Sequence, residues 1–192
     1  MKKYLSLFSQ HIADHKKEWG IGSTVVIVIG LVFLGLALYS YNTAPPKIAY
    51  EPANACDLLT LAEAKTLLGD STINGVVQTP VQQKNITVSK CGYSDGLPDT
   101  ANAVVAAIVV RSGINDAGIQ QNKNEFVAGK PSAGVEDVSG IGDKAYFNTG
   151  NGQLNVLKDS TWIIASYGSG ATPNANTLED VTKLAKLVLN QS

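Results

Sequence analysis

The chain has 192 residues and is close to neutral, with 15 basic and 16 acidic residues and a net charge of −1. Its hydrophobic content of 44% and charged content of 16% are typical of a globular protein of one or two domains. From residue 56 onward ten Lys or Arg face thirteen Asp or Glu, and this net −3 argues against nucleic acid as a partner, which needs clustered positive charge.

An uninterrupted apolar stretch, IGSTVVIVIGLVFLGLAL, runs from Ile21 to Leu38 and carries no charge. Its eighteen residues are about enough to cross the core of a bilayer as a helix. Trp19 precedes the stretch and Tyr39 follows it, at the positions where aromatic rings favour the headgroup region. We therefore predict one transmembrane helix over residues 20–39, in contact with the lipid bilayer.

The distribution of lysines predicts the orientation of this helix. Four lysines precede it, whereas Lys47 is the only basic residue in segment 40–55. Because positive residues gather on the cytoplasmic side, residues 1–19 are predicted to be a cytoplasmic tail. No small-x-small cleavage motif follows, which favours an uncleaved signal anchor in the cell membrane over a cleaved signal peptide. Segment 40–55 contains three prolines and is predicted to be an extended extracytoplasmic stalk before a domain at 56–192.

The first predicted helix of this domain runs from about Leu61 to Leu68. Thr60 is followed three residues later by Glu63, which is the pattern of a capping box. Gly69 directly after the apolar positions supplies a C-cap. A helix with both ends marked in this way is predicted from local signals alone.

Strand patterns follow the first helix. The stretch NITVSKCGYS at 85–94 alternates apolar and polar residues, and AVVAAIVVR at 103–111 is apolar on both faces, which predicts an interior strand. INDAGIQQNKNEFV at 114–127 predicts a further helix, although Gly118 and its asparagines lower the helix propensity. Three later strands, KAYFN, QLNVLK and TWIIASY, are separated by turn signals and are predicted to form an antiparallel meander.

The last predicted helix is capped by Asn176 or Thr177 and has Glu179 and Asp180 in its first turn, where negative charge is favourable. Its apolar stripe comprises Leu178, Val181, Leu184, Ala185 and Val188. The order helix, strands, helix, three strands, helix predicts the α+β class. We expect an antiparallel sheet packed with helices on one or both faces, preceded by the single transmembrane helix.

The two cysteines, Cys56 and Cys91, both lie on the extracytoplasmic side of the predicted topology. An even pair in an oxidising compartment favours a disulfide over a metal site or a nucleophile. Lipid attachment is disfavoured because the stalk separates Cys56 from the apolar stretch. Both histidines, His11 and His15, lie in the predicted tail, so the outer domain lacks the imidazole of a Cys-His or Ser-His-Asp arrangement. We predict no cofactor and no metal.

Weaker signals come from two places. Asp137 and Asp143 flank two glycines in EDVSGIGDKAYF, which suggests a calcium site or an acid-base pair, although a glycine loop leading into a strand is favoured. Trp162 and Tyr167 suggest a ligand groove, although core or sheet positions are favoured for both. A hydrolase that uses carboxylates alone is the enzymatic alternative. Asn85 begins a glycosylation motif, Asn-Ile-Thr, whose use depends on the organism.

Three stretches carry a resemblance to a known family: ACDLLTLAEAKTLLG, KCGYSD and DVSGIGDKAYFNTGNGQLNVLKDSTWIIASYG. Together they resemble the uncharacterised cell-envelope lipoprotein family of actinobacteria, whose members pair a Cys-Asp-Leu-Leu helix start with a Cys-x-Tyr strand. The resemblance spans residues from about 55 to 190. It implies a small disulfide-bonded α+β domain and no known enzymatic residues. The chain departs from the family in having a predicted transmembrane anchor where a lipobox would stand.

The sequence therefore predicts a membrane-anchored extracytoplasmic domain of a bacterial cell envelope that binds an envelope protein, a wall polymer or a small ligand without catalysis. The alternative is a structural or accessory subunit of a membrane protein complex. A ligand-binding domain should show a concave pocket lined by Trp162 or its neighbours. A subunit should instead expose an apolar patch.

Overall fold

The computed structural model describes residues 50–97, 102–169 and 176–190. The predicted cytoplasmic tail, the predicted transmembrane helix and the first part of the predicted stalk lie outside these residues. None of the helices within the described ranges is both long enough and apolar enough to cross a membrane.

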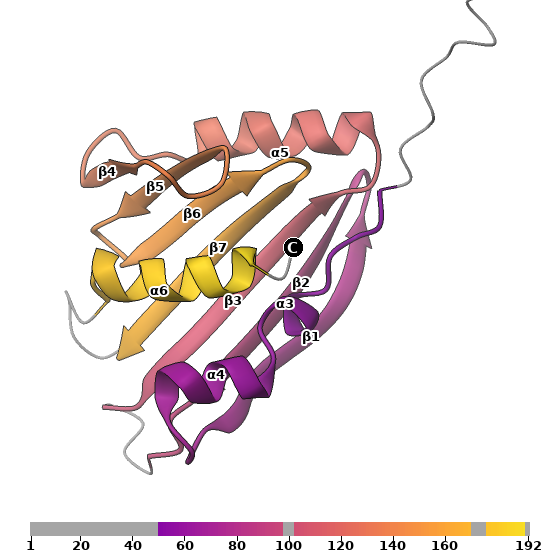
Figure 1. Cartoon of the computed structure of the whole chain (residues 1–192). Helices are drawn as coiled ribbons and strands as arrows, with labels where there is room; N and C mark the ends of the chain where they lie inside the picture. The colour runs from indigo at the N-terminus through magenta and orange to yellow at the C-terminus, as the bar shows by residue number, and fades with distance from the viewer. Residues whose placement is uncertain (1–49, 98–101, 170–175, 191–192) are drawn as a thin grey trace, which may run out of the picture. The chain divides into compact units, whose positions relative to one another are not determined.

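The described residues form four helices and seven strands (Figure 1). In chain order they are α3 (Ala55–Leu58), α4 (Leu61–Leu68), β1 (Ile73–Gln83), β2 (Ile86–Ser94), β3 (Val104–Gly113), α5 (Asp116–Ala128), β4 (Val135–Val138), β5 (Lys144–Asn148), β6 (Gln153–Lys158), β7 (Thr161–Ser169) and α6 (Leu178–Leu189). The strands form one sheet in the order β1-β2-β3-β7-β6-β5-β4, and every neighbouring pair is antiparallel. The α+β class and the antiparallel sheet are confirmed.

Local capping signals explain where two of the longer helices begin. At α4, Thr60 Oγ1 accepts a hydrogen bond from Glu63 N at 3.3 Å, and a Glu63 carboxylate oxygen accepts one from Thr60 N at 2.7 Å. The predicted capping box is therefore present. At α6 the cap is Thr177 rather than Asn176, and its hydroxyl accepts from Asp180 N at 3.1 Å. These side chains satisfy amide groups that have no partner inside the helix.

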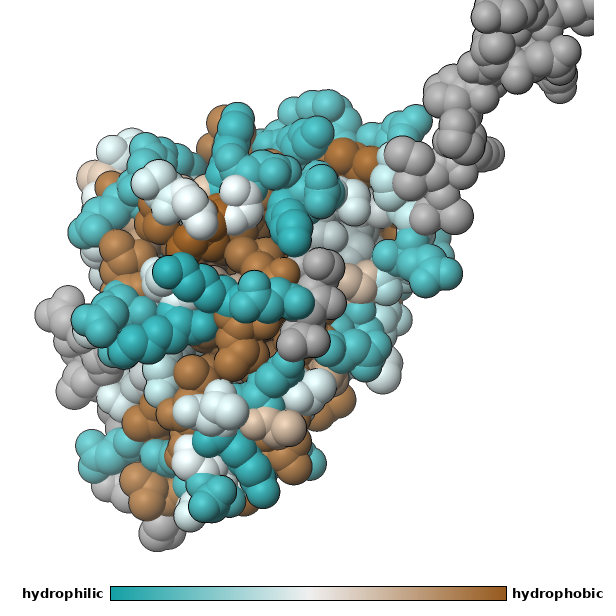
Figure 2. All heavy atoms as spheres, viewed as in Figure 1, coloured by the Kyte–Doolittle hydropathy of each residue, from teal (hydrophilic) through white to brown (hydrophobic). Residues whose placement is uncertain are grey.

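Alternation along the strands gives the sheet two different faces. In β7, Ile163 and Ala165 belong to the main core, which the apolar stripe of α6 and Ala64 of α4 complete. Trp162 points to the opposite face and packs with Phe126 of α5 in a smaller cluster. Helices α3, α4 and α6 thus cover one face of the sheet, and α5 covers part of the other (Figure 1). Figure 2 shows the face that carries α6, where hydrophilic side chains of this helix form a band with hydrophobic residues above and below it.

The interior position predicted for β3 is confirmed, since β3 lies between β2 and β7. Its side chains alternate strictly. Ala106, Ile108 and Val110 are at most 1% exposed on the α6 face, whereas Val105 on the α5 face is 38% exposed. Within the described ranges, the α5 face of β3 is therefore less covered at Val105 than the α6 face is at Ala106 to Val110.

Three elements were not predicted from the sequence: α3, β1 and β4. The glycine-rich residues before β5 were predicted as a loop, and the structure places a short strand at 135–138 before a loop at 139–143. Both outer strands of the sheet are among the missed elements. Their pairing with β2 and β5 defines them, because neither has a regular apolar pattern of its own.

Candidate functional site

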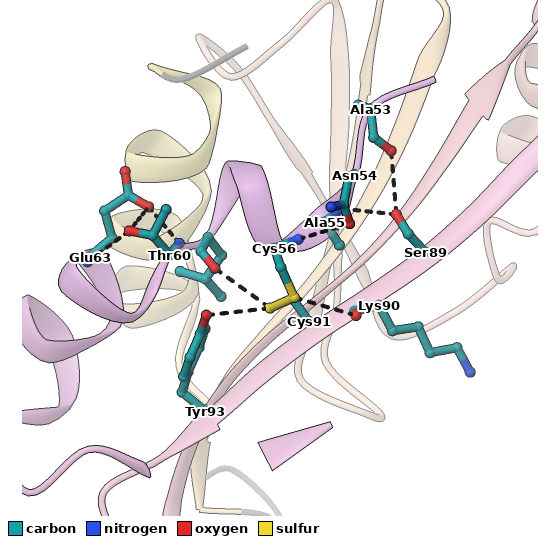
Figure 3. Close-up of a disulfide and its surroundings, with 11 residues drawn as sticks. Ala53, Asn54, Ala55, Cys56, Thr60, Glu63, Ser89, Lys90, Cys91 and Tyr93 are labelled. Carbon is teal, nitrogen blue, oxygen red and sulfur yellow. Dashed lines mark hydrogen bonds between the residues drawn. A yellow bond between two sulfur atoms is a disulfide. The ribbon is translucent and has the colours of Figure 1, made fainter. Parts of the chain in front are cut away.

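Cys56 of α3 and Cys91 of β2, which are 35 positions apart in sequence, form a disulfide with their Cα atoms 5.1 Å apart (Figure 3). The predicted pairing is confirmed. Cys91 is 1% exposed and belongs to the main core. Neither cysteine of the chain is left as a thiol, so neither serves as a nucleophile or a metal ligand in this state.

Hydrogen bonds fix the approach of the chain to this disulfide (Figure 3). The hydroxyl of Ser89 accepts from Ala55 N at 2.9 Å and lies 3.3 Å from the Ala53 carbonyl oxygen, to which it donates. The hydroxyl of Tyr93 lies 3.6 Å from the Cys91 sulfur. Burial, and then the nearby carboxylate of Glu63, raise the pKa of Tyr93. The hydroxyl of Tyr93 therefore stays protonated.

A hollow of about 530 Å³ lies between the C-terminal part of α5, β4 and the loop at 139–143. We call it the α5–β4 hollow. It is lined by Phe126, Val127, Lys130, Asp137, Val138, Ser139, Gly140, Ile141, Gly142, Asp143, Lys144, Ala145 and Tyr146. Its lining is thus an aromatic and aliphatic surface together with charged groups of both signs.

Both predicted aspartates line the α5–β4 hollow, and both have partners. A carboxylate oxygen of Asp137 forms an ion pair with Lys130 Nζ. Asp143 accepts a hydrogen bond from Asp159 N at 2.8 Å, while its own amide donates to Leu157 O at 2.8 Å. Within the described ranges, no group of three or more His, Cys, Asp or Glu could hold a metal ion. Asp143 therefore stabilises the turn between β6 and β7, and Asp137 lies at the charged rim of the α5–β4 hollow.

The two predicted aromatic residues lie on opposite faces of the sheet. Trp162 is 7% exposed, and its Nε1 donates to Asn155 Oδ1 at 3.1 Å. Tyr167 lies on the α6 face, where its hydroxyl donates to Leu67 O at 2.8 Å and burial raises its pKa. The structure therefore does not bring Trp162 and Tyr167 together in one groove.

Trp162 nevertheless connects to the α5–β4 hollow through its neighbours. Its ring contacts Phe126 edge to face with centroids 5.9 Å apart, and Phe126 lies 5.0 Å from the ring of Tyr146. Phe126 and Tyr146 both line the hollow. Arg111 lies over the ring of Trp162, with its Cζ 4.6 Å from the ring centroid, and pairs with Glu125. Such stacking fixes the aromatic lining in place.

Sequence reasoning missed two polar residues that support this aromatic cluster. Arg111 ends an apolar strand, and Asn122 stands in the middle of a helix; each signal is a polar residue at a position where an apolar one would be expected. Asn122 is fully buried, and its Nδ2 donates to Arg111 O at 2.8 Å and to Ser160 O at 2.9 Å. It thereby ties α5 to the ends of β3 and β7.

A smaller hollow of about 370 Å³ shares the loop at 140–143 and is lined on its other side by Lys158, Lys186, Leu189 and Asn190. Most of these residues come from the ends of β6 and α6. The loop thus separates two hollows on adjoining parts of the surface.

Comparison with protein-family models, with curated proteins and with solved structures found no match for this chain.

Proposed function

We propose that this chain is a membrane-anchored extracytoplasmic domain of a bacterial cell envelope, which binds a partner without transforming it. The observation that carries this proposal is the α5–β4 hollow. Its aromatic residues Phe126 and Tyr146 belong to the same buried cluster as Trp162, a residue that the sequence offered as a weak candidate for a ligand groove. Pockets that combine an apolar floor with a few polar groups at the rim are the default ligand sites of small domains.

The location outside the cytoplasm is supported by the disulfide. Disulfides persist in oxidising compartments and are rare in the cytoplasm, and here both cysteines of the chain are paired. The apolar stretch at 20–39 and the lysines before it support the membrane anchor and its orientation. The resemblance to cell-envelope lipoproteins supports the same cellular location.

The chemistry of the hollow favours a polar ligand that has one apolar side. Val127, which is 64% exposed, and the buried rings of Phe126 and Tyr146 supply the apolar part of the lining. Lys130 and Asp137 at the rim offer hydrogen bonds of both kinds. We therefore propose a wall polymer or a small polar ligand as the partner. The engagement of Asp137 and Asp143 with partners of their own supports binding rather than acid-base chemistry.

A charge reversal in the hollow tests this proposal. Lys130→Glu places a carboxylate beside Asp137, so we expect affinity for soluble wall-polymer fragments to fall by about tenfold, or 1.4 kcal/mol. Lys123→Glu is the matched control, because Lys123 is an exposed lysine of α5, the helix that ends just before Lys130, and does not line the hollow. Binding is measured by calorimetry with the full chain in detergent micelles, titrated with defined wall fragments.

The comparison between the two variants decides the outcome. If Lys123→Glu weakens binding as much as Lys130→Glu, the effect comes from net charge and the hollow is not the site. If the wild-type chain binds none of the fragments and photo-crosslinking at Val127 captures only an envelope protein, the proposed ligand class is wrong.

A second candidate, an accessory subunit of a membrane complex, is favoured by one observation. Strand β1 exposes aliphatic side chains at the edge of the sheet, including Val76 and Val77 at 64% and 58%. Exposed apolar groups that gather in one place mark sites of protein contact. Co-purification of a stoichiometric membrane partner, lost when β1 is altered, would favour this candidate.

A further inference from the structure

Strand β1 forms one edge of the sheet and pairs only with β2 among the described strands. It has eleven residues, INGVVQTPVQQ, none of them charged. Four of its side chains are large, hydrophobic and exposed: Ile73 at 54%, Val76 at 64%, Val77 at 58% and Val81 at 46%. Only four other large hydrophobic residues of the described chain are exposed, so half of these exposed residues lie on a single strand.

The opposite edge of the sheet has a different character. Strand β4 has four residues, and two of them, Glu136 and Asp137, are acidic and exposed. A short charged edge discourages further strand pairing. The two edges of this sheet thus differ: β4 is protected by length and charge, whereas β1 is long and uncharged.

Two features of β1 limit how a partner strand can pair with it. The register against β2 shifts by one residue between Asn74 and Val77, and again between Gln78 and Val81. These bulges increase the local twist, and Pro80 has no amide hydrogen to donate. A partner must therefore match an irregular strand, which favours a specific partner over open-ended aggregation.

We propose that β1 pairs in the antiparallel direction with β1 of a second copy of this chain, about a two-fold axis near Gln78. Because β1 carries no charge, its self-pairing brings no like charges together. The two copies share the same bulges, so their twists match. Since β4 offers no equivalent edge, the pairing closes at two copies and does not propagate into a filament. This surface is distinct from the α5–β4 hollow, so the inference goes beyond the proposed function.

The interface is small, because one strand from each copy supplies most of it. Contacts of this size give weak association in dilute solution. Confinement to a membrane by the predicted anchor raises the effective concentration of one copy around another, which compensates for weak intrinsic affinity. We therefore expect dimers at membrane density and monomers in dilute micelles.

Cysteine crosslinking in native membranes tests the pairing and its direction. With the axis near Gln78, Gln78→Cys of one copy lies opposite Gln78→Cys of the other, so a short bismaleimide reagent gives a covalent dimer. Ile73→Cys lies about 33 Å from its own counterpart at about 3.3 Å per residue, so it gives no dimer alone. Mixed with Gln83→Cys, it lies opposite its partner and gives a heterodimer.

Val127→Cys is the control for random collision, because Val127 is 64% exposed but lies on α5. It should give no dimer. A β1 variant, Val76→Lys, should abolish crosslinking at Gln78→Cys because it brings two positive charges to the interface, whereas Val127→Lys should not. Retention of the Cys56–Cys91 disulfide in each variant, seen by peptide mapping without reduction, shows that the domain has folded.

Three results would overturn the proposal. One is absence of a Gln78→Cys dimer in membranes where Gln78→Cys is labelled and the disulfide is intact. A second is dimer formation by Ile73→Cys alone, which would mean parallel or random contact. The third is crosslinking of Gln78→Cys to another polypeptide in place of a second copy.

Discussion

Gly142 turns the loop at 139–143 back against β6. Its φ is +58°, a conformation that residues with a side chain rarely adopt. A Cβ atom there would lie 2.6 Å from Val156 Cγ1 and 2.7 Å from Leu157 O. Position 142 therefore requires glycine for both its backbone conformation and its space, and the shape of the α5–β4 hollow depends on it.

Gly142→Ala should lower the free energy of unfolding by about 2–4 kcal/mol, from backbone strain and overpacking together. Gly140→Ala is a close control, because Gly140 has a φ of +76° but a Cβ atom there would meet open space, with no contact within 4 Å. Gly140→Ala should lower the free energy of unfolding by about 1 kcal/mol, from backbone strain alone. The measurement is denaturant unfolding of the full chain in micelles, followed by near-ultraviolet circular dichroism. If Gly142→Ala and Gly140→Ala lower the free energy of unfolding equally, the proposed clash of a Cβ atom at position 142 is contradicted.

At the same scale, the sequence predicted the disulfide residues but only part of the hollow. Cys56 and Cys91 could be paired because they are the only two cysteines of the chain. Asp137 and Asp143 were recognised as a possible site, and the structure brings both to one hollow. The pairing of Asp137 with Lys130 could not be foreseen, because it depends on how α5 packs beside β4.

The three longer helices and the inner strands could be predicted because their signals are local. Capping residues mark the starts of α4 and α6, and alternating or continuous apolar residues mark β2 and β3. The edge strand β1 has no such signal: it contains glycine and proline, and every residue except Gln78 is exposed. Its conformation comes from pairing with β2, a tertiary contact that no short window of sequence contains.

Thr60→Ala tests the best-marked element boundary. The substitution removes the hydroxyl that accepts from Glu63 N, so we expect a loss of about 1 kcal/mol in the free energy of unfolding. Thr60→Ser keeps a hydroxyl and should stay within about 0.5 kcal/mol of the wild type. Both values come from the same unfolding measurement. If Thr60→Ser is as unstable as Thr60→Ala, the loss of stability comes from the missing methyl group of Thr60 and not from the missing helix cap.

The described domain as a whole is a single sheet whose two faces are covered by helices to different extents. One face holds the main core under α3, α4 and α6, and the other is covered by α5 over part of its length. The disulfide joins the first helical turn to β2, on the main-core side. Covalent closure of this loop restricts the unfolded chain and so favours the folded one.

Replacing both cysteines, Cys56→Ala with Cys91→Ala, should lower the free energy of unfolding by about 4 kcal/mol for a loop of 35 positions. Wild-type protein treated with a reductant should unfold at a similar denaturant concentration. The control is the double variant treated with the same reductant, which should not change further. If the double variant unfolds at the wild-type midpoint, hydrogen bonds such as those of Ser89 hold α3 in place without the disulfide.

The position of the disulfide also determines how the domain bears mechanical load. A pull on the chain from its N-terminal side reaches Cys56 before it reaches α4, and the covalent link passes it directly into β2. The residues between the two cysteines, including α4 and β1, are bypassed by this route and carry none of the tension. A pull that extends the segment before Cys56 would therefore leave α4 and β1 folded for as long as the disulfide remains oxidised.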